Sequence, residues 1–226
     1  MLLSAKEIRR RMSLPFPDRL VVTPLLADHQ LRDGEAGIDV RLGQDFIVAE
    51  RAALDRIDPL NIPPQHLTGY LRRVRVPIGD AFVLHPRQFA LGATLEYCRL
   101  PYDLAADVIG RSRWARVGLV IAMATFVQPG YAGCLTLELQ NLGDLPLDLY
   151  PGLPIAQLVV YESMRAVRRR PSQFHCSIGP EFPDLVDRSD RLALESFQNE
   201  FTRLSAPWTQ QADPPRGRRR GTRRTG

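Results

Sequence analysis

Cysteine is scarce in this sequence, and its scarcity excludes two kinds of cross-linked protein. The 226 residues contain only three cysteines, Cys98, Cys134 and Cys176, an odd number at wide spacings that does not suit a disulfide framework. No CxxC pair occurs, which excludes a zinc site of the type built on such pairs. We therefore expect a protein of a reducing compartment that is stabilised by a hydrophobic core.

Long apolar runs are also lacking. No uninterrupted apolar stretch approaches the roughly 20 residues that a helix needs to span a bilayer. The N-terminal segment MLLSAKEIRRRM has no apolar core like that of a signal peptide. The sequence thus predicts a soluble, cytoplasmic protein without a membrane segment.

Most of the chain lacks an excess of either positive or negative charge, although the whole sequence has a formal net charge of +5. Residues 207–226 hold six arginines and one acidic residue, and the rest of the chain carries equal numbers of basic and acidic side chains. This tail is rich in Pro, Gly and Arg, so it cannot pack a core and is expected to be disordered. Its charge could bring it into weak contact with nucleic acid or an acidic partner, or could only keep the protein soluble.

The sequence does contain many short segments rich in β-branched residues, separated by 19 prolines and 16 glycines. This pattern is typical of an all-β barrel or sandwich and not of a doubly wound sheet. Helix is expected chiefly over 182–204 and at the start of the chain, where Ser4 and Glu7 have capping-box spacing. The expected strands lie within residues 20–26, 37–48, 72–78, 81–86, 88–100, 106–110, 118–127, 134–141, 145–150 and 154–163.

The segment CLTLELQN alternates apolar and polar residues and places a carboxylate, Glu138, on the face opposite its leucines. A strand glutamate is usually exposed to solvent, unless its face lines a pocket. The preceding segment TFVQPGYAG contains a Pro-Gly turn and predicts a hairpin with Tyr131 at its tip. The alternative for Tyr131 is an aromatic side chain that only rests on the sheet.

The segment GRSRWARVGL concentrates basic residues directly after a glycine. On a helix, Ser112 and Arg116 would share one face, and the free N–H groups of the helix start would join them in a seat for an anion. The alternative is a solvated basic turn in which Ser112 is an ordinary N-cap.

Five motifs, taken in order, resemble the dCTP deaminase branch of the dUTPase superfamily. They are GIDVRLG, FVLHPRQFALGATLE, GRSRWARVGL, QPGYAGCLTLELQN and YPGLPIAQL, and the resemblance extends over Leu2 to Glu162. It implies a mostly β, distorted β-barrel subunit of the dUTPase-like β-clip type, with a short N-terminal helix and a C-terminal helical extension. It also implies a homotrimer with nucleotide sites between subunits and Mg²⁺ on the triphosphate. The domains expected are 1–164 for this fold, 165–206 for a closing segment and helix, and 207–226 for the tail.

The resemblance also implies roles for individual residues. Glu138 matches the catalytic glutamate of the family, a general acid/base for deamination, with Ser112 and Arg116 organising the water and the base. Arg111 and Arg113 would contact phosphates, and Tyr131 would stack near the deoxyribose. The implied nucleotide-binding residues are Arg111, Ser112, Arg113, Trp114, Ala115, Arg116, Gln128, Tyr131, Thr136, Leu137, Gln157, Gln173 and His175.

Three departures from the family pattern bear on activity. Phe126 stands where family deaminases commonly have an arginine near the catalytic water, and Gln128 stands where the superfamily usually has a water-activating aspartate. An amide cannot accept a proton as a carboxylate does. In the closing segment, Gln173 and His175 match only loosely and the expected tyrosine is missing.

These residues support one main hypothesis and two alternatives. The main hypothesis is deamination of dCTP to dUTP and ammonia, with dTTP as an inhibitor, and without catalytic zinc because the HxE and PCxxC motifs of zinc deaminases are absent. The first alternative is a deoxynucleotide-binding regulatory module that has lost turnover. The second is dUTP hydrolysis, including a bifunctional conversion of dCTP to dUMP.

Overall fold

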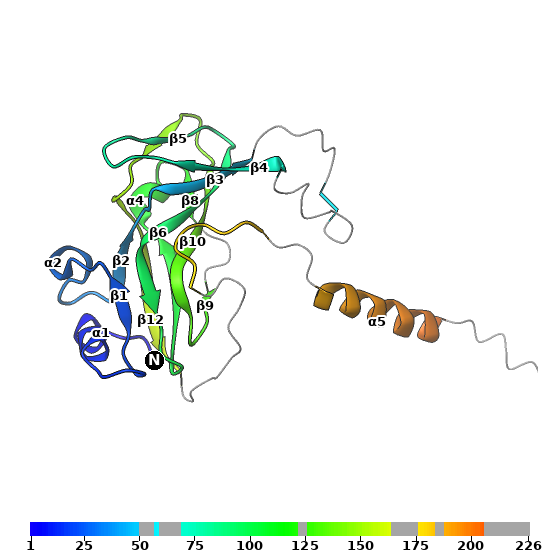
Figure 1. Ribbon diagram of the computed structural model, residues 1–226, viewed down its shortest axis with the longest axis horizontal. Helices are drawn as coiled ribbons and strands as arrows, with labels where there is room; N and C mark the ends of the chain where they lie inside the picture. Colours follow the sequence, from blue (N-terminus) through cyan, green and yellow to red (C-terminus); the bar gives the residue numbers. More distant parts are fainter. Residues whose placement is uncertain (50–56, 59–68, 122–125, 164–175, 184–187, 206–226) are drawn as a thin grey trace, which may run out of the picture. The chain divides into compact units, whose positions relative to one another are not determined.

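The computed structural model describes residues 1–49, 57–58, 69–121, 126–163, 176–183 and 188–205. Most of its regular structure is strand (Figure 1), which confirms the predicted mostly β fold with a short N-terminal helix and a C-terminal helical extension. The helices are α1 (Ala5–Met12), α2 (Ala27–Gln30), α4 (Ser112–Ala115) and α5 (Arg188–Ser205). The strands are β1 (Val21–Thr23), β2 (Ile38–Arg41), β3 (Asp45–Ala49), β4 (Leu71–Arg75), β5 (Phe82–Leu84), β6 (Phe89–Arg99), β7 (Leu104–Gly110), β8 (Leu119–Ile121), β9 (Phe126–Val127), β10 (Ala132–Asn141), β11 (Leu147–Leu149) and β12 (Pro154–Glu162).

The described strands form three sheets. The largest has the order β4-β3-β6-β10-β8, with β1 pairing to β6, the second has the order β2-β12-β7-β9, and β11 pairs with β5. Every pair of named strands is antiparallel, as is typical of barrels and sandwiches built from hairpins and short connections. The long strands β6 and β10 lie side by side through the middle of the body (Figure 1) and are joined by the longest ladder of the large sheet.

One predicted strand was wrong in its extent. The segment 118–127 was expected to form a single strand, but β8 pairs with β10 in the large sheet whereas β9 pairs with β7 in another sheet. The chain therefore changes sheets within this segment. Apolar β-branched residues suit both strands equally, so composition could not show the change.

The core is formed by the apolar faces of the sheets. In β10, Leu135, Leu137 and Leu139 are buried, as their alternation predicts. The rings of Phe46 and Phe82 stack with centroids 4.2 Å apart and join β3 to β5.

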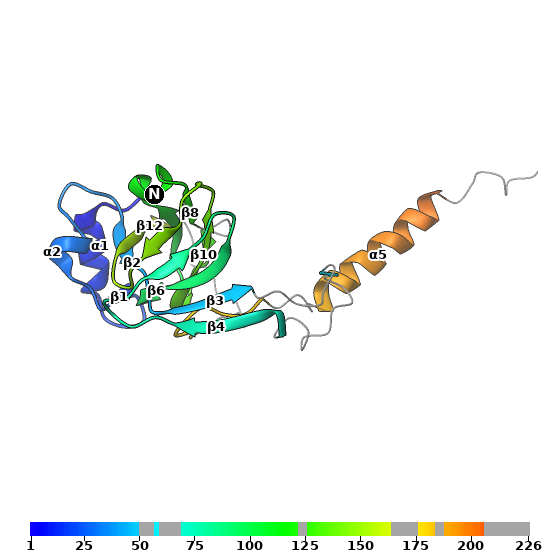
Figure 2. The same cartoon turned by 90° about the horizontal axis from the view of Figure 1, so that it is seen from above.

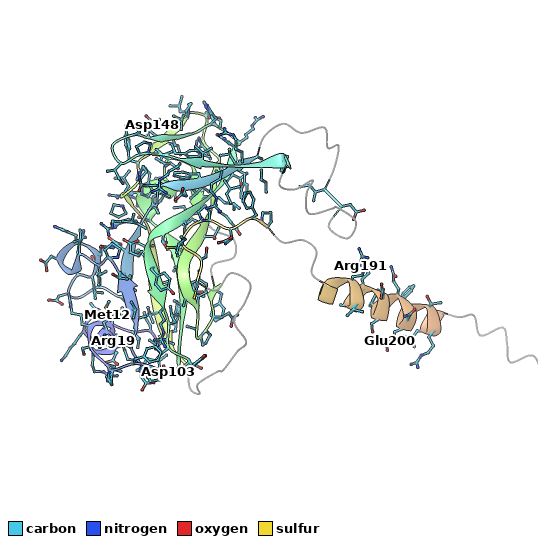
Figure 3. The ribbon with its side chains drawn as sticks, viewed as in Figure 1. Met12, Arg19, Asp103, Asp148, Arg191 and Glu200 are labelled. Atoms are coloured by element: carbon cyan, nitrogen blue, oxygen red, sulfur yellow. The ribbon has the colours of Figure 1, made fainter. Side chains whose placement is uncertain are left out.

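Helix α1 begins at the predicted N-cap, because the Ser4 hydroxyl accepts the Glu7 amide proton at 3.4 Å. Ile8 is fully buried on the inner face of α1, and the nearly buried Arg11 pairs with Asp103. Both α1 and α2 lie on the same side of the body, beside β1 and β2 (Figures 1 and 2). Met12 and Asp103 are found at the same end of the body in Figure 3, in agreement with that ion pair.

A fully buried carboxylate, Glu96 on β6, ties α2 and β2 to the large sheet. It accepts hydrogen bonds from Gln30 Nε2 at 2.8 Å, from the Arg41 amide at 2.8 Å and from Arg41 Nε at 2.6 Å. A buried charge is tolerated when it is paired and fully hydrogen-bonded in this way.

The chain divides into two compact units. The first comprises residues 1–57 and 63–183 and contains every described strand, and the second comprises 58–62 and 184–226. The second unit contains α5, which begins six residues later than the helix expected over 182–204.

Candidate functional site

A buried aspartate, Asp39, gathers two of the predicted nucleotide-binding residues. Its side chain is only 3% exposed; one carboxylate oxygen pairs with the Arg111 guanidinium, and the other accepts a hydrogen bond from Gln157 Nε2 at 3.0 Å. The register of the sheet explains why these three residues lie close together. Gln157 on β12 lies opposite Asp39 on β2 and opposite Ile109 on β7, and Arg111 follows directly after β7. Asp39 thereby fixes the orientation of a guanidinium that is itself partly exposed.

Sequence reasoning missed Asp39 as a site residue. The motif GIDVRLG was used only for the family resemblance, and its single acidic residue was given no role. The available signal was an aspartate in a short apolar strand, since a buried acidic residue is rare unless it is paired.

Ser112 and Arg116 lie one helical turn apart at the surface, as predicted. Both are exposed, and the Arg116 amide donates to the Ser112 carbonyl oxygen at 3.1 Å. In the alternative interpretation of this segment Ser112 was an ordinary N-cap, and that part of it is wrong: Arg111 occupies the N-cap position and makes no side-chain capping bond. The Ser112 hydroxyl is therefore not needed to cap α4.

Arg113 and Trp114 are held by the chain itself. Arg113 NH2 and Trp114 Nε1 both donate to the Pro154 carbonyl oxygen at 3.0 Å, and the Arg113 guanidinium lies 5.4 Å from the centre of the Trp114 ring. Trp114 also packs against the hydrophobic core, while Ala115 is exposed. These contacts hold α4 against the start of β12, so Arg113 has a structural role in this chain.

Strand β10 presents Glu138 as the sequence alternation predicts. Leu137 is completely buried, Thr136 is exposed and Glu138 is half-buried. A ligand could contact Leu137 only through its main chain, whereas Thr136 and Glu138 offer their side chains on the opposite face.

Tyr131 follows a tight Pro-Gly turn that is closed by a hydrogen bond from its amide to the Gln128 carbonyl oxygen at 3.1 Å. Its hydroxyl donates to the Cys134 carbonyl oxygen at 2.7 Å, and burial raises the pKa of this hydroxyl. The ring therefore braces its own hairpin. Gln128 is exposed, and Phe126 is 54% exposed, at the position where the family commonly has an arginine.

A segment near the C-terminal end of the first unit, residues 176–183, lies along β10. The Cys134 amide donates to the Ser177 carbonyl oxygen, and the Cys176 amide donates to the Ala132 carbonyl oxygen, both at 2.7 Å. Further along, the Glu181 amide lies 3.4 Å from the Thr136 hydroxyl oxygen, so the segment reaches the face that carries Glu138. The predicted site residues Gln173 and His175 lie outside the described residues.

A cavity of about 380 Å³ lies between this segment and strands β3, β4, β6 and β10. Its lining includes Asp45, Arg73, Arg75, Thr94 and Cys134, and none of the described residues that were predicted as site residues. The predicted site residues that the structure describes fall mainly into two groups: the Asp39 cluster with α4, and the face of β10 that carries Glu138.

Two of the three cysteines, Cys98 and Cys134, are buried, and burial raises the pKa of their thiols, which makes them poor nucleophiles. Within the parts of the chain that the structure describes, no three His, Cys, Asp or Glu side chains come together as a metal site. None of the described helices is long and apolar enough to cross a membrane.

The three antiparallel sheets, with the predicted site residues on and beside their strands, define a mostly β protein. The chain belongs to the dCTP deaminase-like family, whose profile matches residues 2–163. It is 38% identical over 187 residues to a dCTP deaminase of Natronomonas pharaonis, which covers 80% of this chain and 93% of that protein. It is 39% identical over 147 residues to a dUMP-forming dCTP deaminase of Methanobrevibacter smithii, which covers 65% of this chain and 73% of that protein.

Among solved structures, the fold is similar to that of the 2′-deoxycytidine 5′-triphosphate deaminase from Agrobacterium tumefaciens. The TM-score is 0.53 at 20% identity, and the match covers 72% of this chain. The present chain spans about half of that longer protein, since 48% of it is covered. These comparisons confirm the family that the sequence motifs indicated.

Proposed function

We propose that this chain converts dCTP to dUTP and ammonia, with Glu138 as the general acid/base. The observation that carries the proposal is the position of Glu138, a half-buried carboxylate whose strand neighbours Leu137 and Leu139 are completely buried. The strand thus holds the carboxylate in a fixed place at the edge of the core. Relatives that are 38% and 39% identical are dCTP deaminases, which supports this substrate.

Deamination adds water at C4 of cytosine and expels the amino group as ammonia. The Glu138 carboxylate takes a proton from the attacking water as the C4–O bond forms and gives it to ring nitrogen N3. It then takes the second proton from the new C4 hydroxyl and gives it to the amino group, so that the C4–N bond breaks and ammonia leaves. One residue can serve both transfers because each of them returns it to the ionised carboxylate. Ser112 at the start of α4 and Arg116 at its C-cap would orient the water and the base.

Arg111 is suited to bind the triphosphate because Asp39 holds its guanidinium in one orientation. A pre-oriented guanidinium loses little conformational freedom when it binds phosphate oxygens. Both carboxylate oxygens of Asp39 are already bonded, one to Arg111 and one to Gln157, so we do not assign Asp39 as a Mg²⁺ ligand. Mg²⁺ would instead bind together with the triphosphate, whose negative charge it neutralises. We further propose dTTP as a competing ligand.

We also propose a homotrimer with sites between subunits. The proposed catalytic residue Glu138 lies on β10, whereas the residues assigned to the phosphates and to the orientation of the base lie on or directly beside α4. A neighbouring copy would bring an α4 surface against the face of β10 that carries Glu138. Both surfaces are exposed on the single chain, which leaves them accessible to such a contact.

The proposed product is dUTP and not dUMP. Release of diphosphate from dUTP needs a group that activates water, and Gln128 is an amide at the position where the superfamily usually has an aspartate. The relatives include both dUTP-forming and dUMP-forming enzymes, so the family alone leaves the product open.

A second candidate function is nucleotide binding without turnover. The exposed Phe126 favours it, because an apolar ring replaces the arginine that the family resemblance places near the catalytic water. This candidate predicts dCTP binding with no product.

Chromatography of the products distinguishes these functions. Purified full-length protein is incubated with Mg²⁺ and either dCTP or dUTP, and the nucleotides are then resolved. We expect dUTP from dCTP and no consumption of dUTP. Formation of dUMP would contradict the product assignment, and binding of dCTP without any product would favour the second candidate.

A further inference from the structure

Helix α5 carries a stripe of four large apolar residues. Leu194, Phe197, Phe201 and Leu204 are separated by three, four and three residues, which is the spacing of positions a and d in a heptad repeat. On an α-helix this spacing places all four side chains along one narrow face. We call these four residues the α5 seam.

The seam is exposed to an extent that is unusual for residues of this type. Leu194 is 37% exposed, Phe197 65%, Phe201 61% and Leu204 72%. The rings of Phe197 and Phe201 lie 6.0 Å apart and stack, so the seam is a continuous apolar surface. Continuous exposed apolar surface commonly marks a site of interaction with another molecule.

The spacing and the charges of α5 indicate which partner covers the seam. The charged side chains described on the rest of the helix are Arg191, Glu195, Glu200 and Arg203, two of each sign, and Arg191 and Glu200 are marked in Figure 3. A helix that lies on an anionic membrane or tracks nucleic acid usually has a basic polar face. A neutral face with both signs is instead compatible with a copy of itself, and the heptad spacing fits a helix partner.

We propose that the α5 seam is a self-association surface that packs against the α5 seam of other copies of this chain. Two heptads are too short to associate strongly alone. In an assembled oligomer, however, the strand-rich units would hold the helices at high effective concentration. The inference therefore rests on the homotrimer proposed above, to which α5 would add a second contact.

Disulfide cross-linking of the full-length chain tests the proposal. In a Cys176→Ser background, which removes the exposed cysteine, Leu204→Cys places a thiol in the seam and Asn199→Cys places one on the opposite face. Cys98 and Cys134 remain buried. After mild oxidation, we expect disulfide-linked dimers on a non-reducing gel with Leu204→Cys and none with Asn199→Cys.

A dilution series followed by sedimentation velocity gives a second readout. Phe197→Glu should weaken association at least about tenfold, because the effective-concentration gain is lost, whereas Asn199→Glu should leave it unchanged. A trimer that persists with no seam cross-link and no effect of Phe197→Glu would overturn the inference and leave the trimer standing. A monomeric wild-type chain without cross-links would contradict both. Flotation with anionic vesicles that requires Phe197, again without cross-links, would assign the seam to a membrane and overturn the inference.

Discussion

Asp39 is the residue at which the sheet and the proposed phosphate site meet. It pairs with Arg111, which directly follows β7, and accepts a hydrogen bond from Gln157 on β12, so the positions of both proposed nucleotide contacts depend on the register of β2, β12 and β7. A side chain positioned by paired strands is held more precisely than one on an unsupported loop.

Replacing Asp39 with asparagine should therefore affect both stability and binding. Asp39→Asn leaves the partly buried Arg111 guanidinium without its counter-charge, which typically costs about 3–5 kcal/mol for a buried pair. We expect a clear fall in melting temperature and weaker dCTP affinity, measured by thermal denaturation and isothermal titration.

Asp33→Asn is a matched control. Asp33 pairs with Arg9 on α1, but its side chain is 91% exposed, and exposed pairs contribute little. Equal melting temperatures and affinities for the two variants would show that the Asp39 cluster is not an organising element.

At the residue scale, the sequence predicted the positions that depend on local pattern. Alternation along β10 identified the face of Glu138, and helical spacing placed Ser112 beside Arg116. It could not show that Arg113 and Trp114 bind the carbonyl oxygen of Pro154, which lies 40 residues away along the chain. That contact depends on which strands become neighbours.

At the scale of elements, β10 is the central support of the proposed catalytic face. Strand β6 pairs along one edge of β10, and on the other edge the 176–183 segment pairs at Gly133 and β8 pairs at Leu139. Glu138 thus lies on a strand that is held along both edges. Its position should depend on how well the C-terminal segment docks.

Gly133→Ala tests this docking. Gly133 has φ +146°, and an added Cβ would lie 3.0 Å from the Tyr131 hydroxyl oxygen and 3.1 Å from the Ser177 nitrogen. We expect a loss of about 1–3 kcal/mol of stability and faster hydrogen exchange at the amides of Cys134 and Cys176. Native-state hydrogen exchange provides the measurement.

Gly152→Ala is the control that distinguishes the effect of backbone strain from the effect of a steric clash with the 176–183 segment. Gly152 also has a positive φ, +92°, but no atom would lie within 4 Å of its added Cβ. This variant should lose some stability through strain and leave the Cys134 and Cys176 amides protected. Faster exchange in both variants would mean that strain alone, and not the segment contact, controls these amides.

Most of the expected strands were found, because each one is marked by its own composition and turn residues. The failure at 118–127 has a different origin: β8 and β9 differ in their partners and not in their residue types. Pairing between distant strands is a property of the whole sheet, which local pattern does not encode.

At the scale of the whole molecule, the net positive charge of the chain comes from its tail, residues 207–226. Because basic and acidic side chains are balanced before residue 207, deletion of residues 209–226 should leave trimer formation and dCTP turnover almost unchanged. It should abolish any salt-sensitive binding to nucleic acid, measured by fluorescence anisotropy over a salt series. Undiminished DNA binding after deletion would place the basic site elsewhere, and loss of the trimer would show that the tail is part of the assembly.

The central claim is that Glu138 carries the proton transfer of dCTP deamination. Glu138→Gln preserves the size of the side chain and removes its ability to accept a proton, so dCTP should still bind while turnover falls by about 10²–10⁴-fold or more. The most direct measurement compares dUTP formation and dCTP affinity for Glu138→Gln with those of Glu35→Gln, which alters an exposed glutamate far along the sequence. The account predicts near-normal affinity in both variants and loss of turnover in Glu138→Gln alone. Near-normal turnover by Glu138→Gln would contradict it.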